Sequence, residues 1–155
     1  QFYSFMKNSI RLLAILFLAS FALASCDKDD EATPTLYDRL GGVAAISAVV
    51  DQFLTNVVGD NVINARFAAT VANPARTQLL RNNLIDQICA GAGGPCQYKG
   101  KTMLESHKGM NITQAEFNAL VGDLVAALDK FNVPQKEKDD LLAILGPMQT
   151  DIVGK

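Results

Sequence analysis

The single histidine of this sequence, His107, is the residue whose surroundings point most directly to chemistry. It follows Met103 by four positions, and Gly109 comes two positions later, so we expect it at the end of a short helix beside apolar neighbours such as Leu104. The carbonyl of Met103 could then accept a hydrogen bond from the imidazole Nδ1–H, leaving Nε2 free to bind a metal. The alternative is a partly buried histidine with a structural role. A site that needs two imidazoles is excluded within this sequence.

Two of the three cysteines, Cys89 and Cys96, are seven positions apart across a glycine-rich segment. In an oxidising compartment this spacing suits a disulfide, and the alternative is a pair of buried thiols. The pattern resembles neither a CxxC redox motif nor a CxxCH haem-attachment motif.

The N-terminal residues 1–25 are predicted to be a secretory signal peptide. Lys7 and Arg11 precede an uncharged stretch over residues 12–24, and Met6 is the expected start of translation. Because a membrane-spanning helix needs about 20 apolar residues, this stretch is too short to be a comfortable span.

The third cysteine, Cys26, follows Leu23-Ala24-Ser25, which resembles the lipobox of bacterial lipoproteins. The resemblance implies cleavage before Cys26 and lipidation of its thiol, so that the acyl chains hold the protein on the periplasmic face of a membrane or on the cell surface. Residues 26–35 are acidic and contain proline, which indicates a flexible tether. The alternative is an ordinary cleavable signal with an incidental cysteine.

The composition indicates one globular domain. Of 155 residues, 49% are hydrophobic and 19% are charged, which is enough apolar sequence for one core. The formal net charge is −2 from 14 basic and 16 acidic residues. Since residues 1–25 contain two basic and no acidic residues, 12 basic and 16 acidic residues remain after cleavage, a net charge of −4. A nucleic-acid-binding function is therefore not expected.

The spacing of apolar residues after residue 35 predicts an all-α domain. A capping box, Thr113 with Glu116, marks the start of one helix whose apolar stripe reaches Phe131. Val43 and Val58 are expected on the apolar face of another. The predicted helices cover residues 36–40, 43–58, 75–88, 103–108 and 114–131, and a last one begins near 135 and is kinked at Gly146-Pro147.

Several segments together resemble the truncated haemoglobins of the first group, the two-over-two globins. The resemblance covers residues 36–153 and is carried by LYDRLGG at 36–42, VVDQF at 49–53, GGPCQYKGKTMLESHKGMNIT at 93–113, LVAALDKFNVP at 124–134 and ILGPMQTDIV at 144–153. It implies a two-over-two helical globin domain over residues 36–155. It also implies one haem b per chain, held between the Leu80–Ile88 helix and the short His107 helix. Because the cysteines do not form a CxxCH motif, we expect this haem to be held without covalent attachment.

The resemblance also implies roles for single residues. His107 matches the proximal haem-iron ligand, Phe67 matches the phenylalanine that stacks on the haem, and Met103 should pack on the porphyrin. The other residues expected to line the pocket are Phe53, Leu54, Leu80, Asn83, Leu84, Ile88, Phe117 and Val121. Each apolar residue among them could instead belong to the ordinary core.

The distal side departs from the family pattern. Many members place a tyrosine directly after the residue that matches Phe53 and pair it with a glutamine, whereas this sequence has Leu54. Leu80 and Leu84 are expected to face the iron, with Asn83 and Gln87 at the edge of the pocket. Because a donor to a polarised ligand is worth ~1–3 kcal/mol, we expect CO and NO to bind readily and O2 to leave fast.

The expected function is therefore reversible binding of O2, NO or CO. Three alternatives stay open from the sequence: an NO dioxygenase served by an unidentified reductase, a peroxidase-like haem enzyme, and a haem-free helical lipoprotein. Arg81, Lys101 and Lys108 are candidates to pair with the haem propionates, although such charges are more often solvated.

Overall fold

The computed structural model describes residues 33–155. The predicted signal peptide, the lipidation site Cys26 and most of the tether lie outside the described residues. The helices are α2 (Leu36–Arg39), α3 (Gly42–Gly59), α4 (Asn64–Val71), α5 (Pro74–Gly91), α6 (Met103–His107), α7 (Gln114–Lys130), α8 (Gln135–Leu145) and the 3₁₀ helix η1 (Gly146–Asp151). No strand occurs between residues 33 and 155, where Ile112 and Val153 form one isolated bridge, so the all-α prediction is confirmed.

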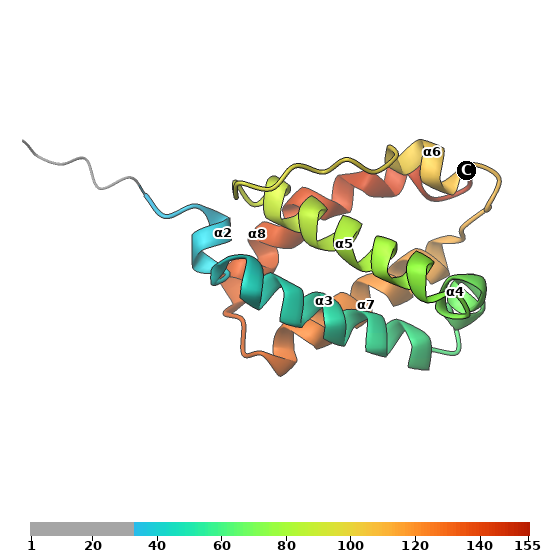
Figure 1. Ribbon diagram of the computed structural model, residues 1–155, viewed down its shortest axis with the longest axis horizontal. Coiled ribbons are helices and arrows are strands. Elements are labelled where there is room, and N and C mark those ends of the chain that lie inside the picture. Colours follow the sequence, from blue (N-terminus) through green and yellow to red (C-terminus); the bar gives the residue numbers. More distant parts are fainter. Residues whose placement is uncertain (1–32) are drawn as a thin grey trace, which may run out of the picture. The chain divides into compact units, whose positions relative to one another are not determined.

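The helices pack as two pairs, one across the other. Figure 1 shows α3 and α5 in front of α7 and α8. α3 packs against both α5 and α7, while the short α2 joins α3 to α8. This two-over-two arrangement leaves α6 at the margin of the domain, where it contacts η1.

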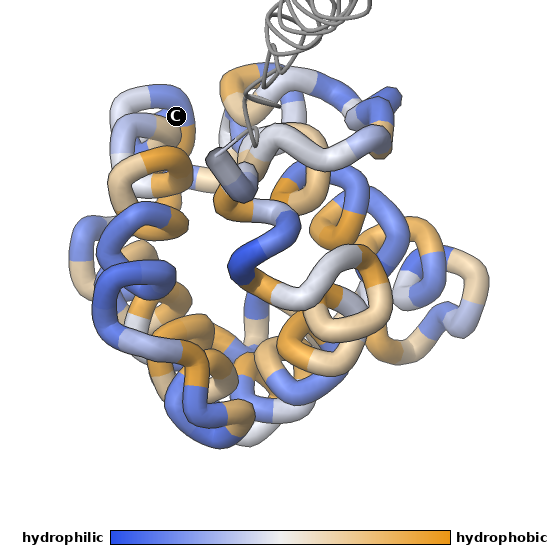
Figure 2. The backbone as a smooth tube through the Cα atoms, turned by 90° about the vertical axis from the view of Figure 1, so that its left-hand side faces the viewer, coloured by the Kyte–Doolittle hydropathy of each residue, from blue (hydrophilic) through white to orange (hydrophobic). Residues whose placement is uncertain are grey.

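One large apolar core holds the four long helices together. Its most buried side chains include Val50, Val57 and Leu128, each at most 1% exposed. Apolar and polar segments alternate along the helices in Figure 2, as expected when each helix turns one face inward. α3 is long and apolar enough to cross a membrane by length and composition alone, but it packs against α5 and α7 in this core.

The predicted helix boundaries have local causes in the structure. The side chain of Thr113 accepts a hydrogen bond from Glu116 N at 3.2 Å and completes the predicted capping box of α7. Asn73 caps α5, and Pro74 occupies its first position. At Gly94 an added Cβ would lie 2.4 Å from Cδ2 of Tyr37, so the chain can pass there only because this residue has no side chain.

Three expectations about helices are wrong. α4 was not expected, because it is only eight residues long and none of its residues is buried. Phe131 caps α7 and is 44% exposed, since the helix ends one residue earlier than its apolar pattern suggests. Val43 and Val58 lie at the two ends of α3, where no neighbouring helix covers them, and both are exposed. The predicted kink at Gly146-Pro147 is the change from α8 to η1.

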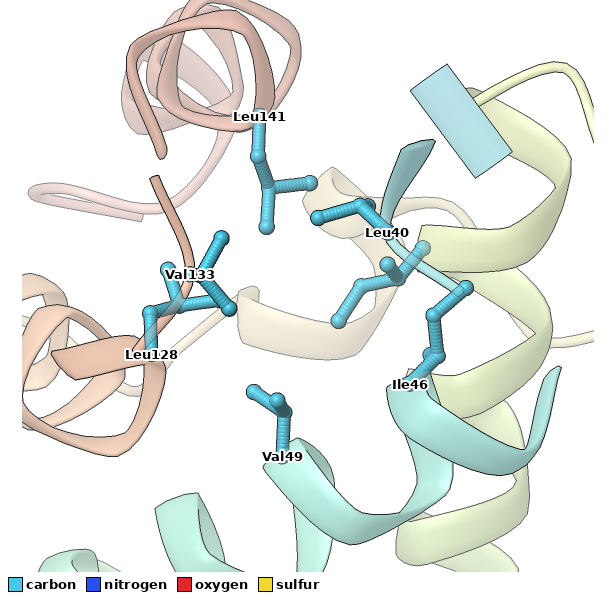
Figure 3. A pocket seen from close by; sticks show the side chains of 7 residues that line it. Leu40, Ile46, Val49, Leu128, Val133 and Leu141 are labelled. Carbon is cyan, nitrogen blue, oxygen red and sulfur yellow. The ribbon is translucent and has the colours of Figure 1, made fainter. Parts of the chain in front are cut away.

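A small apolar cavity lies where α2, α3, α5, α7 and α8 meet. Figure 3 shows Leu40, Ile46, Val49, Leu128, Val133 and Leu141 pointing toward it, and Ile88 completes the lining. Of the residues predicted to contact haem, Ile88 alone lines this cavity, so the cavity is a packing defect of the main core and a separate feature from the predicted site.

Candidate functional site

His107 is the last residue of α6 and is half-buried. Its Nδ1 lies 2.7 Å from the backbone oxygen of Met103, one turn earlier, as the spacing predicts. A carbonyl oxygen can only accept, so Nδ1 carries the proton and donates. In the neutral ring Nε2 is then unprotonated, and no partner for it occurs among the described residues. The structure therefore holds this imidazole in the tautomer that a metal ligand requires.

The helix that carries His107 is short and is held by hydrogen bonds at both ends. At its start, the Thr102 side chain accepts from Glu105 N at 3.2 Å, and the Glu105 carboxylate accepts from Thr102 N at 3.0 Å. This capping box also lowers the pKa of Glu105, because the carboxylate accepts from the Thr102 hydroxyl and backbone. None of the five residues of α6 is buried, and Leu104, expected beside apolar neighbours, is 46% exposed.

The apolar residues predicted to line the pocket fall into two clusters. Phe53 and Ile88 are buried in the main core, and Leu54, Phe67 and Leu84 pack against it. The second cluster is built on Ile112, Phe117 and Ile152, with Met103, Val121 and Met148 packed against it. We call it the α6 cluster. The first group lies on α3, α4 and α5. The second group includes Met103 of α6, the helix that carries His107, together with Phe117 and Val121 of α7.

Two of the predicted pocket residues join neither cluster. Leu80 and Asn83 are half-buried on α5, outside both groups of packed apolar side chains.

Gln87 reaches across from α5 to the α6 cluster. Its Nε2 lies 3.0 Å from Sδ of Met148 and 3.6 Å from Sδ of Met103. Thioether sulfurs are weak acceptors, so these contacts orient the amide while contributing little energy. The sequence places Gln87 at the edge of the pocket, and in the structure its donor faces residues of α6 and η1.

The polar residues considered for the haem propionates are not equivalent. Arg81 forms a two-pronged ion pair with Asp51 on α3, with Nη2 at 2.8 Å from Oδ2. The hydrogen bond from Arg81 holds the pKa of the Asp51 carboxyl below its usual value. Arg81 is therefore engaged between α3 and α5. Lys101 and Lys108, on either side of α6, are both exposed.

Cys89 and Cys96 form a disulfide in the structure. Of the two alternatives open from the sequence, the structure has the covalent one. The bond joins the last turn of α5 to the chain that leads toward α6.

Arg66 belongs to a polar cluster that the sequence gives no reason to expect. Arg66 of α4 donates from Nε to Oε1 of Glu116 at 2.6 Å, from Nη2 to Oε2 at 3.2 Å, and from Nη1 to the Met110 carbonyl at 2.9 Å. The bonds from Arg66 and Thr113 lower the pKa of Glu116 to about 2. No sequence motif signals this cluster, because 50 residues separate Arg66 from Glu116.

These residues fit a non-covalently held haem by the chemistry of their side chains. A metalloporphyrin needs one axial donor and apolar surfaces for its two faces. The chain supplies an imidazole with one nitrogen fixed by hydrogen bonding, and apolar side chains from two clusters. No group of three or more His, Cys, Asp or Glu side chains that could hold a bare metal ion occurs within residues 33–155.

Comparisons with known proteins agree with this architecture. The model of the bacterial-like globin family matches residues 35–153. The chain is 32% identical over 123 residues to a group 1 truncated hemoglobin of Tetrahymena thermophila, covering 79% of this chain and 97% of that protein. It is 30% identical over 118 residues to the group 1 truncated hemoglobin GlbN of Mycolicibacterium paratuberculosis, covering 76% of this chain and 83% of the relative.

Comparison with solved structures also identifies truncated hemoglobins as similar proteins. The crystal structure of truncated hemoglobin from Tetrahymena pyriformis in its Fe(III) form superposes with a TM-score of 0.71 at 30% identity, covering 79% of this chain and all of the other. The 2/2 hemoglobin of a Synechococcus species gives 0.70 at 26% identity, covering 77% of this chain and 98% of the other. This chain belongs to the bacterial-like globin family and is a truncated, two-over-two globin that binds haem without covalent attachment and takes diatomic gases as ligands.

Proposed function

We propose that His107 is the proximal ligand of the haem iron and that the pocket around the bound gas is largely apolar. The observation that carries this proposal is the 2.7 Å hydrogen bond from Nδ1 of His107 to the Met103 carbonyl. It orients the ring, fixes its tautomer and leaves Nε2 as the donor for a metal. When bound, haem supplies an iron with a position open to O2, NO or CO.

The apolar residues of the two clusters would hold the porphyrin and exclude water. On the α3–α5 side these are Phe53, Leu54, Phe67, Leu84 and Ile88, together with Leu80 of α5. On the α6 side they are Met103, Phe117 and Val121. Asn83, half-buried on α5, is a polar residue at the edge. Support comes from their division between two clusters that meet α5 and α6.

The distal side would offer the bound gas few hydrogen-bond donors. Leu54 and Leu84 pack against the main core, and their side chains carry no hydrogen-bond donor. With no strong donor to hold a polarised ligand, O2 would dissociate fast and the iron would oxidise readily, whereas CO and NO depend less on such a bond. A separate reductase would then be needed to keep the iron ferrous.

The ligand assignment is tested by His107→Gly in the full chain, with haem titrated into the purified protein. We expect loss of the five-coordinate ferrous spectrum and its recovery when free imidazole is added, because imidazole can occupy the space left by the side chain. Lys108→Ala, which changes the next residue and leaves the Nδ1 bond intact, is the matched control. An unchanged ferrous spectrum in His107→Gly would show that another group ligates the iron.

The apolar distal side is tested by measuring O2 dissociation in the wild type and in Leu54→Tyr. A phenol at this position would add a donor, so the variant should release O2 roughly 10- to 100-fold more slowly. Leu54→Phe, which adds the ring without the hydroxyl, separates the hydrogen bond from the change in size. A wild-type rate already as slow as that of the tyrosine variant would contradict the proposal.

We further propose that the protein is exported as a lipoprotein. The arguments are the signal-like residues 1–25, the lipobox-like residues ending at Cys26, and the tether over residues 26–35. The Cys89–Cys96 disulfide suits an oxidising compartment outside the cytoplasm. Such a protein would be anchored on the periplasmic face of a membrane or on the cell surface. Cells fed a labelled fatty acid should transfer label to the wild type and none to Cys26→Ser, and label on both would refute the site.

A further inference from the structure

Arg66 links the distal side of the domain to the chain that follows His107. It lies on α4 directly before Phe67, and its guanidinium reaches both Glu116 at the start of α7 and the carbonyl of Met110. Met110 is three residues after His107, and its own amide donates to the His107 carbonyl at 3.0 Å. We call the three bonds from Arg66 to Glu116 and Met110 the Arg66 strap.

Between Met103 and Thr113, the segment on which the strap acts, Ile112 is the one buried residue. α6 has no buried residue. The link from α6 to α7 contains Gly109 with φ +83° and Asn111 with φ 49°, two positions in the left-handed region. The backbone N–H of Asn111 donates to the Lys155 carbonyl at 2.6 Å, and the backbone N–H of Gly154 donates to the Ile112 carbonyl at 2.9 Å. The C-terminal residues and Arg66 therefore both form hydrogen bonds with the link.

Glu116 is fixed independently of Arg66. Its Oε2 accepts from Thr113 N at 2.8 Å and from the Thr113 hydroxyl at 2.9 Å, within the capping box of α7. Its side chain is 15% exposed. A planar guanidinium that meets a pre-oriented carboxylate by two bonds, and a carbonyl by a third, has a defined position. Arg66 thus ties α4 to the link at a specified geometry.

We infer that Arg66 is a positioning residue for the haem site: through Glu116 and Met110 it sets the place of His107 relative to Phe67 and slows haem loss. This inference rests on the proposed function, since it takes His107 as the iron ligand. Arg66 itself touches neither the haem nor the gas. The inference goes beyond ligation by naming a residue outside the pocket that controls how long the cofactor stays bound.

The decisive variant is Arg66→Met in the full-length, haem-loaded protein. Methionine keeps the aliphatic volume and removes all three bonds. Haem dissociation, followed by transfer to excess apomyoglobin, should become about 5- to 20-fold faster, because bonds to charged groups are among the stronger ones in proteins. The iron–histidine stretching band of the ferrous protein should shift or broaden, since the imidazole would be less firmly placed.

Arg39→Met is the matched control. Arg39 also makes two charged contacts, to Glu137 at 3.0 Å and to Asp140 at 2.6 Å, but it joins α2 to α8, which do not carry His107. This control should destabilise the apoprotein to a similar small degree while leaving the haem-loss rate and the iron–histidine band at wild-type values. Arg66→Lys, which keeps the charge but cannot satisfy three acceptors at once, should lose haem at an intermediate rate.

Two results would overturn the inference. One is a haem-loss rate in Arg66→Met no higher than in Arg39→Met. The other is faster loss with an unchanged iron–histidine band, which would reduce Arg66 to a general stabilising role. If Arg66→Met does not fold, Arg66→Lys is the deciding variant. A haem-loss rate in Arg66→Lys equal to that of the wild type would then reject the positioning role of Arg66. A wild type with no iron–histidine band would instead refute ligation by His107, so the two failures are distinguishable.

Discussion

The two helices proposed to face the haem are held in place by different forces. α5 has 18 residues and buries Ile85, Ile88 and Cys89 in the main core. α6 has five residues and buries none. Besides the packing of Met103 on the α6 cluster, α6 is held by directional bonds: the capping box of Thr102, the bonds of the link to the C-terminal segment, and the Arg66 strap.

Because of this difference, we expect folding stability and haem retention to depend on different parts of the molecule. Burial of apolar side chains is roughly proportional to area and tolerates small displacements, whereas a hydrogen bond weakens steeply as its geometry changes. The imidazole that we propose as the iron ligand is on the element with directional support. Changes in the main core should therefore act mainly on folding, and changes around α6 mainly on haem retention.

The largest expected effect is on the main core. Leu128 is 1% exposed, so Leu128→Ala should lower the free energy of unfolding of the apoprotein by about 2–5 kcal/mol. Val121 is on the same helix but is half-buried against the α6 cluster, so Val121→Ala should cost less than about 1.5 kcal/mol and raise the haem-loss rate more than Leu128→Ala does. Urea denaturation and haem transfer measure the two quantities. Equal losses of unfolding free energy in both variants would contradict the comparison.

The next largest effect concerns the end of α5. Replacing both Cys89 and Cys96 by alanine removes a short covalent loop, which should reduce the free energy of unfolding by about 2–3 kcal/mol. The haem-loss rate should change little, because Ile85 and Ile88 still hold α5. Wild type treated with a dithiol reductant is the control and should match the variant. Two reactive thiols in denatured, unreduced wild-type protein would show that Cys89 and Cys96 do not form a disulfide in solution.

The contrast between apolar burial and directional bonds also explains which features could be predicted from the sequence. Long helices with a wide apolar stripe, such as α3 and α7, were predictable because periodic burial forms them. The Nδ1 bond of His107 was predictable because donor and acceptor are one helical turn apart. α4 was missed, since its alanine-rich sequence buries no side chain.

Contacts between distant segments could not be predicted in this way. The bonds of Arg66 to Glu116 and Met110 join residues 50 and 44 positions apart, and the bond of Gln87 to Met148 spans 61. Whether such side chains meet depends on how the helices cross, and no local pattern of residues encodes that. Polar support of a site is therefore the part of this fold that needs three-dimensional information.

A smaller effect should follow from the cap of α6. Thr102→Ala removes the side-chain acceptor for Glu105 N, a loss worth about 1 kcal/mol in helix stability. Haem loss should become up to about fivefold faster, with little change in the unfolding of the apoprotein. Thr35→Ala, which removes the same type of capping box from α2, is the control and should leave haem loss unchanged. Equal haem-loss rates in the two variants would show that α6 does not depend on its cap.

The smallest expected effect is a pH dependence of the strap. The pKa of Glu116 is lowered from 4.5 to about 2, first by the bond from Arg66 and then by those from Thr113. A carboxyl whose pKa is depressed in the folded state stabilises the fold above its unfolded pKa, and that contribution is lost as the pH falls from about 4.5 toward 2. Glu116→Gln keeps a capping-box residue but cannot titrate. The difference in unfolding free energy between wild-type and Glu116→Gln apoprotein should therefore be constant above pH 5 and shrink toward pH 2. A difference that stays constant over that range would mean that Glu116 does not bind Arg66 as a carboxylate in solution.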